Sequence, residues 1–273
     1  MSHDFESIDL GNRALRYICC GTGTTTVIVD QGQGLSIEQG FARSVAAGWA
    51  KVFMEIQKAT RICMHDRAGL GSSDRAITPR TSLDMISDWR TLLREARIAP
   101  PYVLVGHSIG GFNVRVFADK YPDEVLGMVL VDSSHPTQLA RFSEFLPRES
   151  AGEPVMLRLL RHGPDPSSTP EGIDFRASAE QVQTTATLGF KPLVVLSHSP
   201  QALQPTRLPL EIRDNMRHAW AELQNSLLSL SGNSRQVVAN YAGHNIQLEE
   251  PQLVIDAILS VLHQARSRNS PLH

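Results

Sequence analysis

The alternation of short apolar runs with longer segments of helical period constrains the fold of this chain more than any other feature. Most of the short runs are continuously apolar, which is typical of strands buried on both faces of a parallel sheet. Between them, apolar residues fall on one helical face around residues 45–56, 83–96 and 253–262. The pattern predicts an α/β protein with a mostly parallel central sheet and helices on both faces. The predicted strands are Leu15–Cys20, Thr25–Asp30, Thr60–Asp66, Tyr102–Val105, Leu126–Asp132, Leu193–Ser197 and Arg235–Tyr241.

One interval departs from this alternation, between the predicted strand that ends at Asp132 and the one that begins at Leu193. It holds helix-like pieces around a centre at residues 163–172 that is rich in Pro, Gly and Ser. A structureless connection of that length is uncommon in a compact domain, and 273 residues are enough for one large domain with an insertion. We therefore predict a core domain formed by residues 1–132 and 192–273, with residues 133–191 inserted as a small helical lid.

Charge and composition exclude several classes of partner. The 41% of hydrophobic residues is typical of a globular protein, and a net charge of −2 creates no field that would gather nucleic acid or an anionic membrane surface. The first ten residues lack the basic and apolar parts of a signal peptide, which favours a cytoplasmic location. We expect a small-molecule substrate and a monomer or homodimer. No metal and no cofactor are expected, because histidine and cysteine occur at no spacing typical of metal ligands.

The chain contains three cysteines, Cys19, Cys20 and Cys63. Their number is odd, two are adjacent, and all lie in apolar stretches that resemble strands. This pattern argues against a disulfide framework and predicts buried thiols.

The sharpest functional signal follows the predicted strand that begins at Tyr102. The strand leads into Gly106-His107-Ser108-Ile109-Gly110-Gly111, and apolar residues at helical spacing come next. Glycines on both sides of Ser108 allow a sharp turn without a clashing Cβ atom, which would raise the serine hydroxyl above the sheet at a helix start. We predict Ser108 as a nucleophile. The alternative is a glycine-rich turn that binds phosphate or no ligand.

A serine hydroxyl needs a general base within hydrogen-bond reach and a third group that orients this base. His244 lies in Tyr241-Ala-Gly243-His244-Asn245, directly after the last predicted strand, on a loop from which an imidazole can reach back over the sheet. We predict His244 as the base. His107 directs its side chain away from the serine by geometry, but together with Gln31 it is a candidate for contact with the substrate.

On these residues the chain resembles the α/β-hydrolase superfamily over nearly its whole length. Besides the turn around Ser108, the matching pieces are Asp66–Ser73, Tyr121–Val125 and the pair Gly243-His244 ahead of Glu250-Pro251. The resemblance implies the α/β-hydrolase fold and a triad in the chain order serine, acid, histidine. It specifies the reaction much less, because this fold hosts many chemistries.

The acid departs from the commonest pattern of that superfamily. Most members carry it after the strand that is here Leu193–Ser197, but the loop His198-Ser-Pro-Gln-Ala-Leu-Gln-Pro contains no carboxylate. Some members place the acid at the end of the preceding strand, where this chain has Asp132. The resemblance therefore implies Asp132 as the third member of the triad. The alternative is that Asp132 caps the turn into Ser133 and Ser134.

Acyl transfer also needs hydrogen-bond donors for the oxyanion of the tetrahedral intermediate. The resemblance implies two backbone N–H groups, one from Ile109 and one from the loop Gln31-Gly32-Gln33-Gly34. The register favours Gln33, with Gln31 as the fallback, and a simple glycine turn is the alternative. The turn at Asp66 and Arg67 is expected to brace the loops below the site.

Together these features predict a serine hydrolase that cleaves a carboxylic ester of a small, fairly apolar substrate through an acyl-enzyme. Serine argues against epoxide hydrolases and haloalkane dehalogenases, which need a carboxylate as nucleophile. A lactonase or an amidase could use the same triad. A lyase similar to hydroxynitrile lyases, a cofactor-free oxygenase and a non-catalytic binding protein are the alternatives of other classes. The candidate lid residues that line the site are Phe142, Phe145 and Met156.

Overall fold

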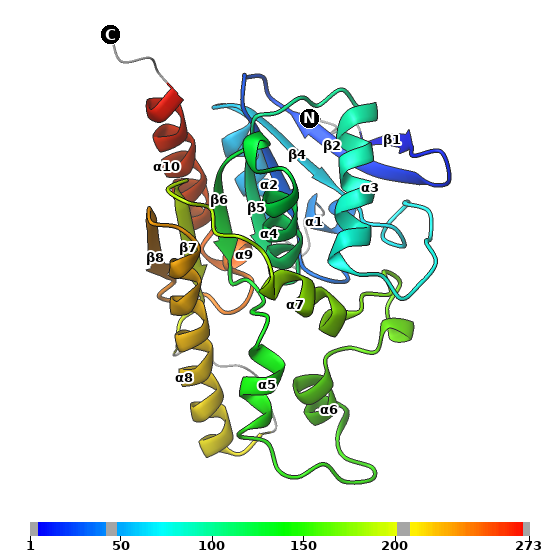
Figure 1. The fold of residues 1–273 in the computed structure, drawn as a ribbon, viewed down its shortest axis with the longest axis vertical. Helices are drawn as coiled ribbons and strands as arrows, with labels where there is room; N and C mark the ends of the chain where they lie inside the picture. The colour runs from blue at the N-terminus through cyan, green and yellow to red at the C-terminus, as the bar shows by residue number, and fades with distance from the viewer. Residues whose placement is uncertain (1–4, 42–47, 201–207, 270–273) are drawn as a thin grey trace.

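The computed structural model describes residues 5–41, 48–200 and 208–269. In this part of the chain the strands form one eight-stranded sheet in the order β1-β2-β4-β3-β5-β6-β7-β8 (Figure 1). The pairs β1–β2 and β2–β4 are antiparallel, and all other neighbours are parallel. This confirms the predicted α/β class. The strands are β1 (Glu6–Asp9), β2 (Ala14–Cys20), β3 (Thr26–Asp30), β4 (Arg61–His65), β5 (Tyr102–His107), β6 (Val125–Val131), β7 (Leu193–Ser197) and β8 (Ser234–Val238).

Both faces of the sheet are covered by helices, which explains why the central strands are continuously apolar. In β3, Val27 and Val29 belong to one buried cluster while Ile28 belongs to the other. The first cluster includes α2 (Trp49–Ile56) and α10 (Pro251–Asn269). The second includes α3 (Ser82–Glu95), α4 (Gly110–Lys120) and α7 (Phe175–Gln183). Figure 1 shows α3 and α10 on opposite sides of the sheet. Because alternate side chains of each strand enter different clusters, every position has to be apolar.

The three predicted helical segments correspond to α2, α3 and α10. Residue 45, the first apolar position of the segment 45–56, lies outside the described residues. At the start of α3, the Asp84 carboxylate accepts hydrogen bonds from the N–H and the hydroxyl of Thr81, each at 2.7 Å. This reciprocal cap satisfies backbone donors that the first helical turn leaves free. None of the described helices has the length and apolar character that crossing a bilayer would require.

The interval 133–191 contains two kinds of structure. Its first part holds α5 (Gln138–Ser143) and α6 (Val155–His162), which pack against each other beyond the end of the sheet (Figure 1). Its last part, α7, packs in the core through Phe175, Ala179 and Val182. Helix α8 (Leu210–Ser226) lies outside this interval but packs on α5. The cover over the sheet is therefore built from α5, α6 and α8. The remaining short elements are α1 (Ile37–Phe41), η1 (Pro122–Glu124), η2 (Pro166–Ser168), η3 (Leu227–Leu230) and α9 (Ile246–Glu249).

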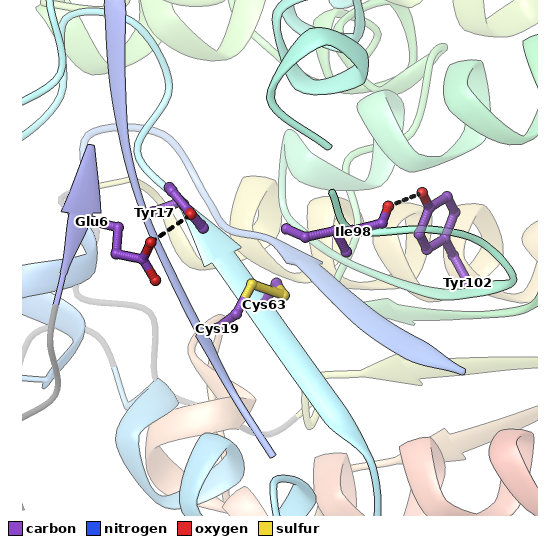
Figure 2. Close-up of a disulfide and its surroundings, with 6 residues drawn as sticks. All are labelled: Glu6, Tyr17, Cys19, Cys63, Ile98 and Tyr102. Atoms are coloured by element: carbon purple, nitrogen blue, oxygen red, sulfur yellow. Dashed lines mark hydrogen bonds between the residues drawn. A yellow bond between two sulfur atoms is a disulfide. The ribbon is translucent and has the colours of Figure 1, made fainter. Parts of the chain in front are cut away.

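The prediction of three buried thiols is wrong for two of the cysteines. Cys19 of β2 and Cys63 of β4 form a disulfide (Figure 2). The antiparallel register places these two residues directly opposite each other, with their Cα atoms 4.2 Å apart. That pairing depends on which strands are neighbours in the sheet, and the spacing of cysteines along the chain carries no information about it.

Candidate active site

The turn between β5 and α4 holds Ser108 in a strained backbone conformation. Its φ of 54° lies in the left-handed region that residues with a side chain rarely adopt. The turn is also too tight for side chains at its glycines. A Cβ atom on Gly106 would lie 2.7 Å from the carbonyl oxygen of Gly110, and one on Gly110 would lie 2.1 Å from that of Asp30. The strand-turn-helix geometry is therefore that of a nucleophile elbow, with a half-buried serine at the start of α4.

The structure brings Asp132 and His244 together from distant parts of the chain. Asp132 follows β6, and its carboxylate Oδ2 lies 2.6 Å from Nδ1 of His244, which is on the loop after β8. The carboxylate is fully buried, whereas 44% of the His244 side chain is exposed. Backbone hydrogen bonds also join the Ser108 turn to the Asp132 loop, from Ser108 N–H to the carbonyl of Val131 at 3.2 Å and from Ser134 N–H to the carbonyl of Ser108 at 2.9 Å. The two strand ends that carry Ser108 and Asp132 are thus tied to each other.

The charges of this pair suit general-base chemistry. Burial alone would raise the pKa of Asp132, but hydrogen bonds and nearby charge from His198 and His244 lower it below the ordinary range of aspartate. Burial alone would lower the pKa of His244, but the hydrogen bond to Asp132 and the charges of Asp132 and Glu249 raise it. Asp132 therefore stays ionised, and His244 is a stronger base than an isolated imidazole.

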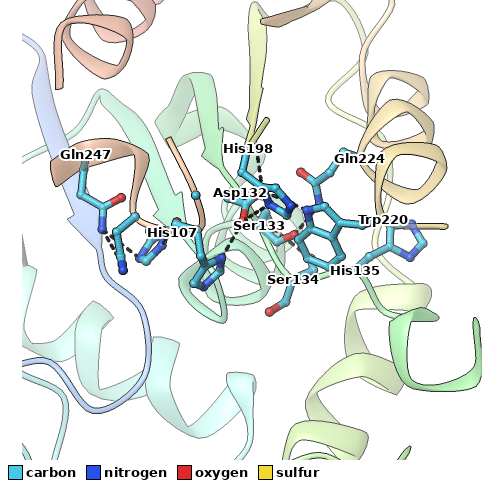
Figure 3. Close-up of polar contacts among 12 residues, drawn as sticks. His107, Asp132, Ser133, Ser134, His135, His198, Trp220, Gln224 and Gln247 are labelled. Carbon is cyan, nitrogen blue, oxygen red and sulfur yellow. Dashed lines mark hydrogen bonds and ion pairs between the residues drawn. The ribbon is translucent and has the colours of Figure 1, made fainter. Parts of the chain in front are cut away.

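Two donors to Asp132 were missed by the sequence analysis. Nδ1 of His198 lies 3.0 and 2.9 Å from the two carboxylate oxygens, and the backbone N–H of His198 donates at 3.1 Å. Nε1 of Trp220 donates to Oδ1 at 3.0 Å. Figure 3 shows both side chains directed at Asp132. His198 stands where the resembling superfamily usually carries its acid, so a histidine at that position was an available signal. Trp220 lies on α8, a helix that the sequence analysis did not predict.

The glycine-rich loop after β3 passes directly over the nucleophile. A Cβ atom on Gly32 would lie 3.4 Å from Cβ of Ser108 and 2.9 Å from Nδ1 of His107. Within the described residues, the N–H of Ile109 has no protein acceptor. Both sources of the predicted oxyanion donors, Ile109 and the loop that carries Gln33, therefore border Ser108.

A buried guanidinium fixes this loop. Arg67 donates to the backbone carbonyls of Gln31 and Gly32, at 2.7 Å each. Its charge is balanced by Asp30 at 2.5 Å and by Glu171 at 2.6 Å, and all three side chains are at least 97% buried. Glu171 also accepts the N–H of Gly34 at 2.7 Å. Burial alone would lower the pKa of Arg67, but the two carboxylates raise it. The Arg67 cluster, defined as Asp30, Arg67 and Glu171, holds both ends of the loop.

We expect Arg67→Met to lower the free energy of unfolding by about 3–5 kcal/mol, because it leaves two buried carboxylates without their cation. Urea denaturation followed by circular dichroism measures this change. The matched control is Glu95→Gln, which breaks an exposed ion pair with Arg94 and should cost less than about 1 kcal/mol. Equal midpoint shifts for the two variants would contradict the assigned role of the cluster.

A cavity of about 850 Å³ opens beside Asp132 and His244. The apolar part of its lining comes from α5, α6, α8 and their neighbourhood, and includes the predicted contact residues Phe142 and Met156 together with Leu160, Leu208, Leu210 and Met216. His198, Trp220 and Tyr241 also line it. The cover helices thus enclose a largely apolar space next to the Asp132–His244 pair.

The other three predicted contact residues are not part of the described lining of that cavity. Phe145 instead packs under the guanidinium of Arg141. The Gln31 side chain is buried, 1% exposed, behind its own loop. His107 is buried beneath His244, and its Nε2 lies 3.0 Å from the His244 carbonyl oxygen (Figure 3). Burial and then the charge of His244 lower the pKa of His107 to about 3, so it supports the His244 loop as a neutral ring.

One group of potential metal ligands lies on the cover. Ligand-type atoms of Glu149, Glu153 and His162 lie within 4.8 Å of one another. However, Arg176 donates to Nδ1 of His162 at 2.8 Å, and Arg161 lies 3.4 Å from the Glu153 carboxylate. Two guanidinium cations therefore already occupy the surroundings of these ligands.

Comparison with known proteins agrees with the fold. A family profile described as alpha/beta hydrolase fold matches residues 37–154. The chain is 28% identical over 256 residues to the uncharacterized protein YqjL of Bacillus subtilis, an alignment that covers 93% of this chain and 89% of YqjL. Among solved structures, the epoxide hydrolase CorEH matches with a TM-score of 0.63 and 18% identity, and a thermophilic esterase from Thermogutta terrifontis with 0.62 and 22%. Each alignment covers 96% of this chain and 99% of the other. At these identities the structures establish the fold alone.

Proposed function

We propose that this chain, which has the α/β-hydrolase fold, hydrolyses carboxylic esters with Ser108 as nucleophile. The observation that carries the proposal is the 2.6 Å contact of His244 with the buried carboxylate of Asp132, next to an elbow that strains Ser108. An ionised acid that orients an imidazole, combined with a serine on a nucleophile elbow, is the arrangement that activates a hydroxyl group.

In the proposed mechanism, Oγ of Ser108 attacks the ester carbonyl carbon while Nε2 of His244 accepts the hydroxyl proton. Asp132 stabilises the imidazolium that forms. The N–H of Ile109 and a donor of the Gln31–Gly34 loop, Gln33 by register, bind the oxyanion. The alcohol leaves with the proton from His244, which produces an acyl-enzyme. Water then attacks the acyl carbon with His244 as base, which releases the acid and restores Ser108.

The cavity supports a small ester with an apolar acyl or alcohol part. Phe142, Met156 and Leu160 present apolar surface on the side of the cover, and a volume of about 850 Å³ is in the range of pockets for small molecules. A serine nucleophile forms an acyl-enzyme with an ester. An epoxide would require a carboxylate nucleophile, so epoxide hydrolysis by CorEH does not transfer to this chain on the basis of the shared fold.

The test combines covalent labelling with turnover. A fluorophosphonate probe should label the protein once, at Ser108, and p-nitrophenyl esters of graded acyl length should be hydrolysed with a burst of p-nitrophenol. Lactones and anilides are assayed in parallel. Labelling without turnover of any ester, lactone or amide would overturn the proposed hydrolysis and favour a lyase or oxygenase reaction. Absence of labelling would overturn the role of Ser108.

We expect kcat/KM to fall with decreasing pH through an apparent pKa above the ordinary histidine value of about 6.5. The base must be neutral, and the hydrogen bond and charge of Asp132 raise the pKa of His244, so activity is lost as the pH drops through that raised value. The pKa of Asp132 is lowered, so its titration lies below the window. A pH profile of kcat/KM between pH 5 and 9 checks this. A decrease of kcat/KM on the acid side of the profile, called its acid limb, with a midpoint clearly below pH 6 would contradict this prediction.

We expect limited proteolysis to cut first within residues 163–170, in the centre of the interval proposed as a lid. This stretch is rich in Pro and Ser and carries exposed residues such as Asp165, Ser167 and Ser168. Cleavage beyond it should be slower, because Glu171 is buried in the Arg67 cluster and the carbonyl of Gly172 accepts from Arg80 N–H at 2.7 Å. Mass spectrometry of early fragments identifies the site. First cuts inside the sheet domain would count against a separable lid.

A further inference from the structure

The Asp132 carboxylate receives more donors than a triad requires. His244 uses one oxygen, Oδ2, at 2.6 Å. The other oxygen, Oδ1, accepts from Trp220 Nε1 at 3.0 Å and from the backbone N–H of His198 at 3.1 Å, and the His198 ring bridges both oxygens at 2.9 and 3.0 Å. All lone-pair directions of a fully buried carboxylate are therefore used by described residues.

We propose that His198 and Trp220 are positioning residues for the hydrolytic reaction: they hold the Asp132 carboxylate in the rotation that directs Oδ2 at His244. The inference rests on the proposed function, because it assigns a role in the same triad. His198 follows β7, where the resembling superfamily usually carries the acid itself. In this chain the proposed acid, Asp132, lies at the end of β6, and His198 after β7 supplies a hydrogen-bond donor that orients it.

The physical reason lies in how the acid is held. Asp132 sits in a turn with a φ of 40°, directly after its strand, and its N–H donates to the carbonyl of Leu196 at 2.7 Å, which fixes the backbone but leaves the rotation of the carboxylate open. A carboxylate bound only through Oδ2 could rotate about its Cβ–Cγ bond, and a buried oxygen without a donor would carry a desolvation cost. Hydrogen bonds donated to Oδ1 prevent this rotation and remove this desolvation cost. The side-chain rotation of Asp132 is then fixed by His198 and Trp220 before substrate binds.

The two donors are themselves fixed by packing. His198 is buried, and its ring stacks on Trp220 with a centroid distance of 6.0 Å and an interplanar angle of 18°. The ring of Trp220 lies against that of Phe142 of α5, with a centroid distance of 6.1 Å. One turn further along α8, Gln224 donates to the carbonyl of Ser133 at 2.7 Å, directly after the acid (Figure 3). The cover helices α5 and α8 are therefore part of the support of Asp132.

Removal of the hydrogen-bond donors to Oδ1 should change the pKa of His244 in a predictable direction. Without these donors the Asp132 carboxylate can rotate away from His244, which weakens the hydrogen bond and the charge that raise the pKa of His244, so this pKa should fall. The other titratable or charged groups around the site are Glu249 of α9, His107 of β5, and Arg213, Asp214 and Arg217 of α8, of which Asp214 and Arg217 are ion-paired. None of these groups changes in the variants below.

The experiment compares His198→Phe, His198→Asn and Trp220→Phe with wild type in kcat, KM and the pH profile. We expect His198→Phe to lower kcat about 10-fold to 100-fold and to move the acid limb of the pH profile to lower pH, with less than about a threefold change in KM. Trp220→Phe should act in the same direction and less strongly. In His198→Asn an amide N–H can stand close to the position of Nδ1, so most of kcat should return. The matched control is His65→Phe, because His65 is also a buried ring stacked on a tryptophan, Trp89, at 5.7 Å.

Several results would overturn the inference. Equal effects of His198→Phe and His65→Phe on kcat, or a lower melting temperature of His198→Phe with an unchanged acid limb, would show that His198 only fills space. An NMR titration of His244 in wild type and in His198→Phe measures the same pKa change without turnover. If wild type cleaves no ester, the proposed function fails. A lower His244 pKa in the variant then still supports the positioning role, and an unchanged or higher one overturns it.

Discussion

Ser108→Ala and His244→Ala should each lower kcat for ester hydrolysis by about 10⁴-fold to 10⁶-fold, with the fold intact. Alanine at position 108 removes the atom that forms the acyl-enzyme. Alanine at position 244 leaves the Ser108 hydroxyl without an acceptor for its proton, and it also leaves the Asp132 carboxylate without its strongest contact. Steady-state kinetics with the best ester of the panel measure both effects, and the double variant should be little worse than either single variant because the residues act as one unit.

Controls for these variants come from the same residue types elsewhere in the chain. Ser143→Ala on α5 and His218→Ala on α8 remove a hydroxyl that donates to the carbonyl of Leu139 and an imidazole that contacts the carbonyl of Asp214, and kcat should stay within a factor of about three of wild type. Ser108→Ala should also abolish fluorophosphonate labelling. Retention of more than about a tenth of kcat by Ser108→Ala or His244→Ala would end the assignment of that residue, because a triad member is not so dispensable.

Asp132→Asn should lower kcat by up to about 10⁴-fold. The amide keeps the shape of the side chain but removes the charge that raises the pKa of His244, so the acid limb of the pH profile should move to lower pH while the maximum rate collapses. The asparagine would also turn an N–H donor toward a site that already holds donors from His198, Trp220 and His244. We therefore expect a lower melting temperature as well, measured by thermal denaturation.

Competing acids can be tested beside Asp132. Glu249 and Glu250 hold the backbone of the His244 loop, through Gly243 N–H at 3.0 Å and Ala242 N–H at 2.8 Å. Glu249→Gln should reduce kcat far less than Asp132→Asn does, and Asp256→Asn, which changes an exposed carboxylate on α10, should have no effect. A Glu249→Gln variant that loses more activity than Asp132→Asn would transfer the role of the acid to Glu249.

Most of the fold could be predicted from the sequence because its signals are local. Strands such as Tyr102–His107 lie between two helix layers and are apolar along most of their length, and the Ser108 turn needs glycines within a few residues of one another. The edge strand β1 was missed, because Glu6–Asp9 is short, polar and exposed, and it becomes a strand only through its register with β2.

The features that could not be predicted depend on contacts between distant segments. The bridge between Cys19 and Cys63 follows from the neighbourhood of β2 and β4 in the sheet. The Asp132 contacts of His198 and Trp220 join segments 66 and 88 residues away, and Trp220 reaches the acid from a helix whose exposed, mostly polar surface gives little periodic signal. For Asp132 itself, a resemblance to known proteins was needed, since an aspartate after a strand is also an ordinary turn residue.

The buried Glu171 bears on how this scaffold can be re-engineered. Its carboxylate comes from the inserted interval, yet it completes the charge balance of Arg67 and binds the N–H of Gly34 in the loop over Ser108. A chimera that exchanges the whole interval 133–191 for that of another enzyme would therefore also remove the carboxylate that pairs with Arg67 and binds the loop over Ser108. A graft that ends before Glu171 and retains α7 exchanges the cavity walls of α5 and α6 and keeps the cluster whole. The useful crossover points for altering substrate range thus lie at the flanks of α5 and α6, well inside the interval.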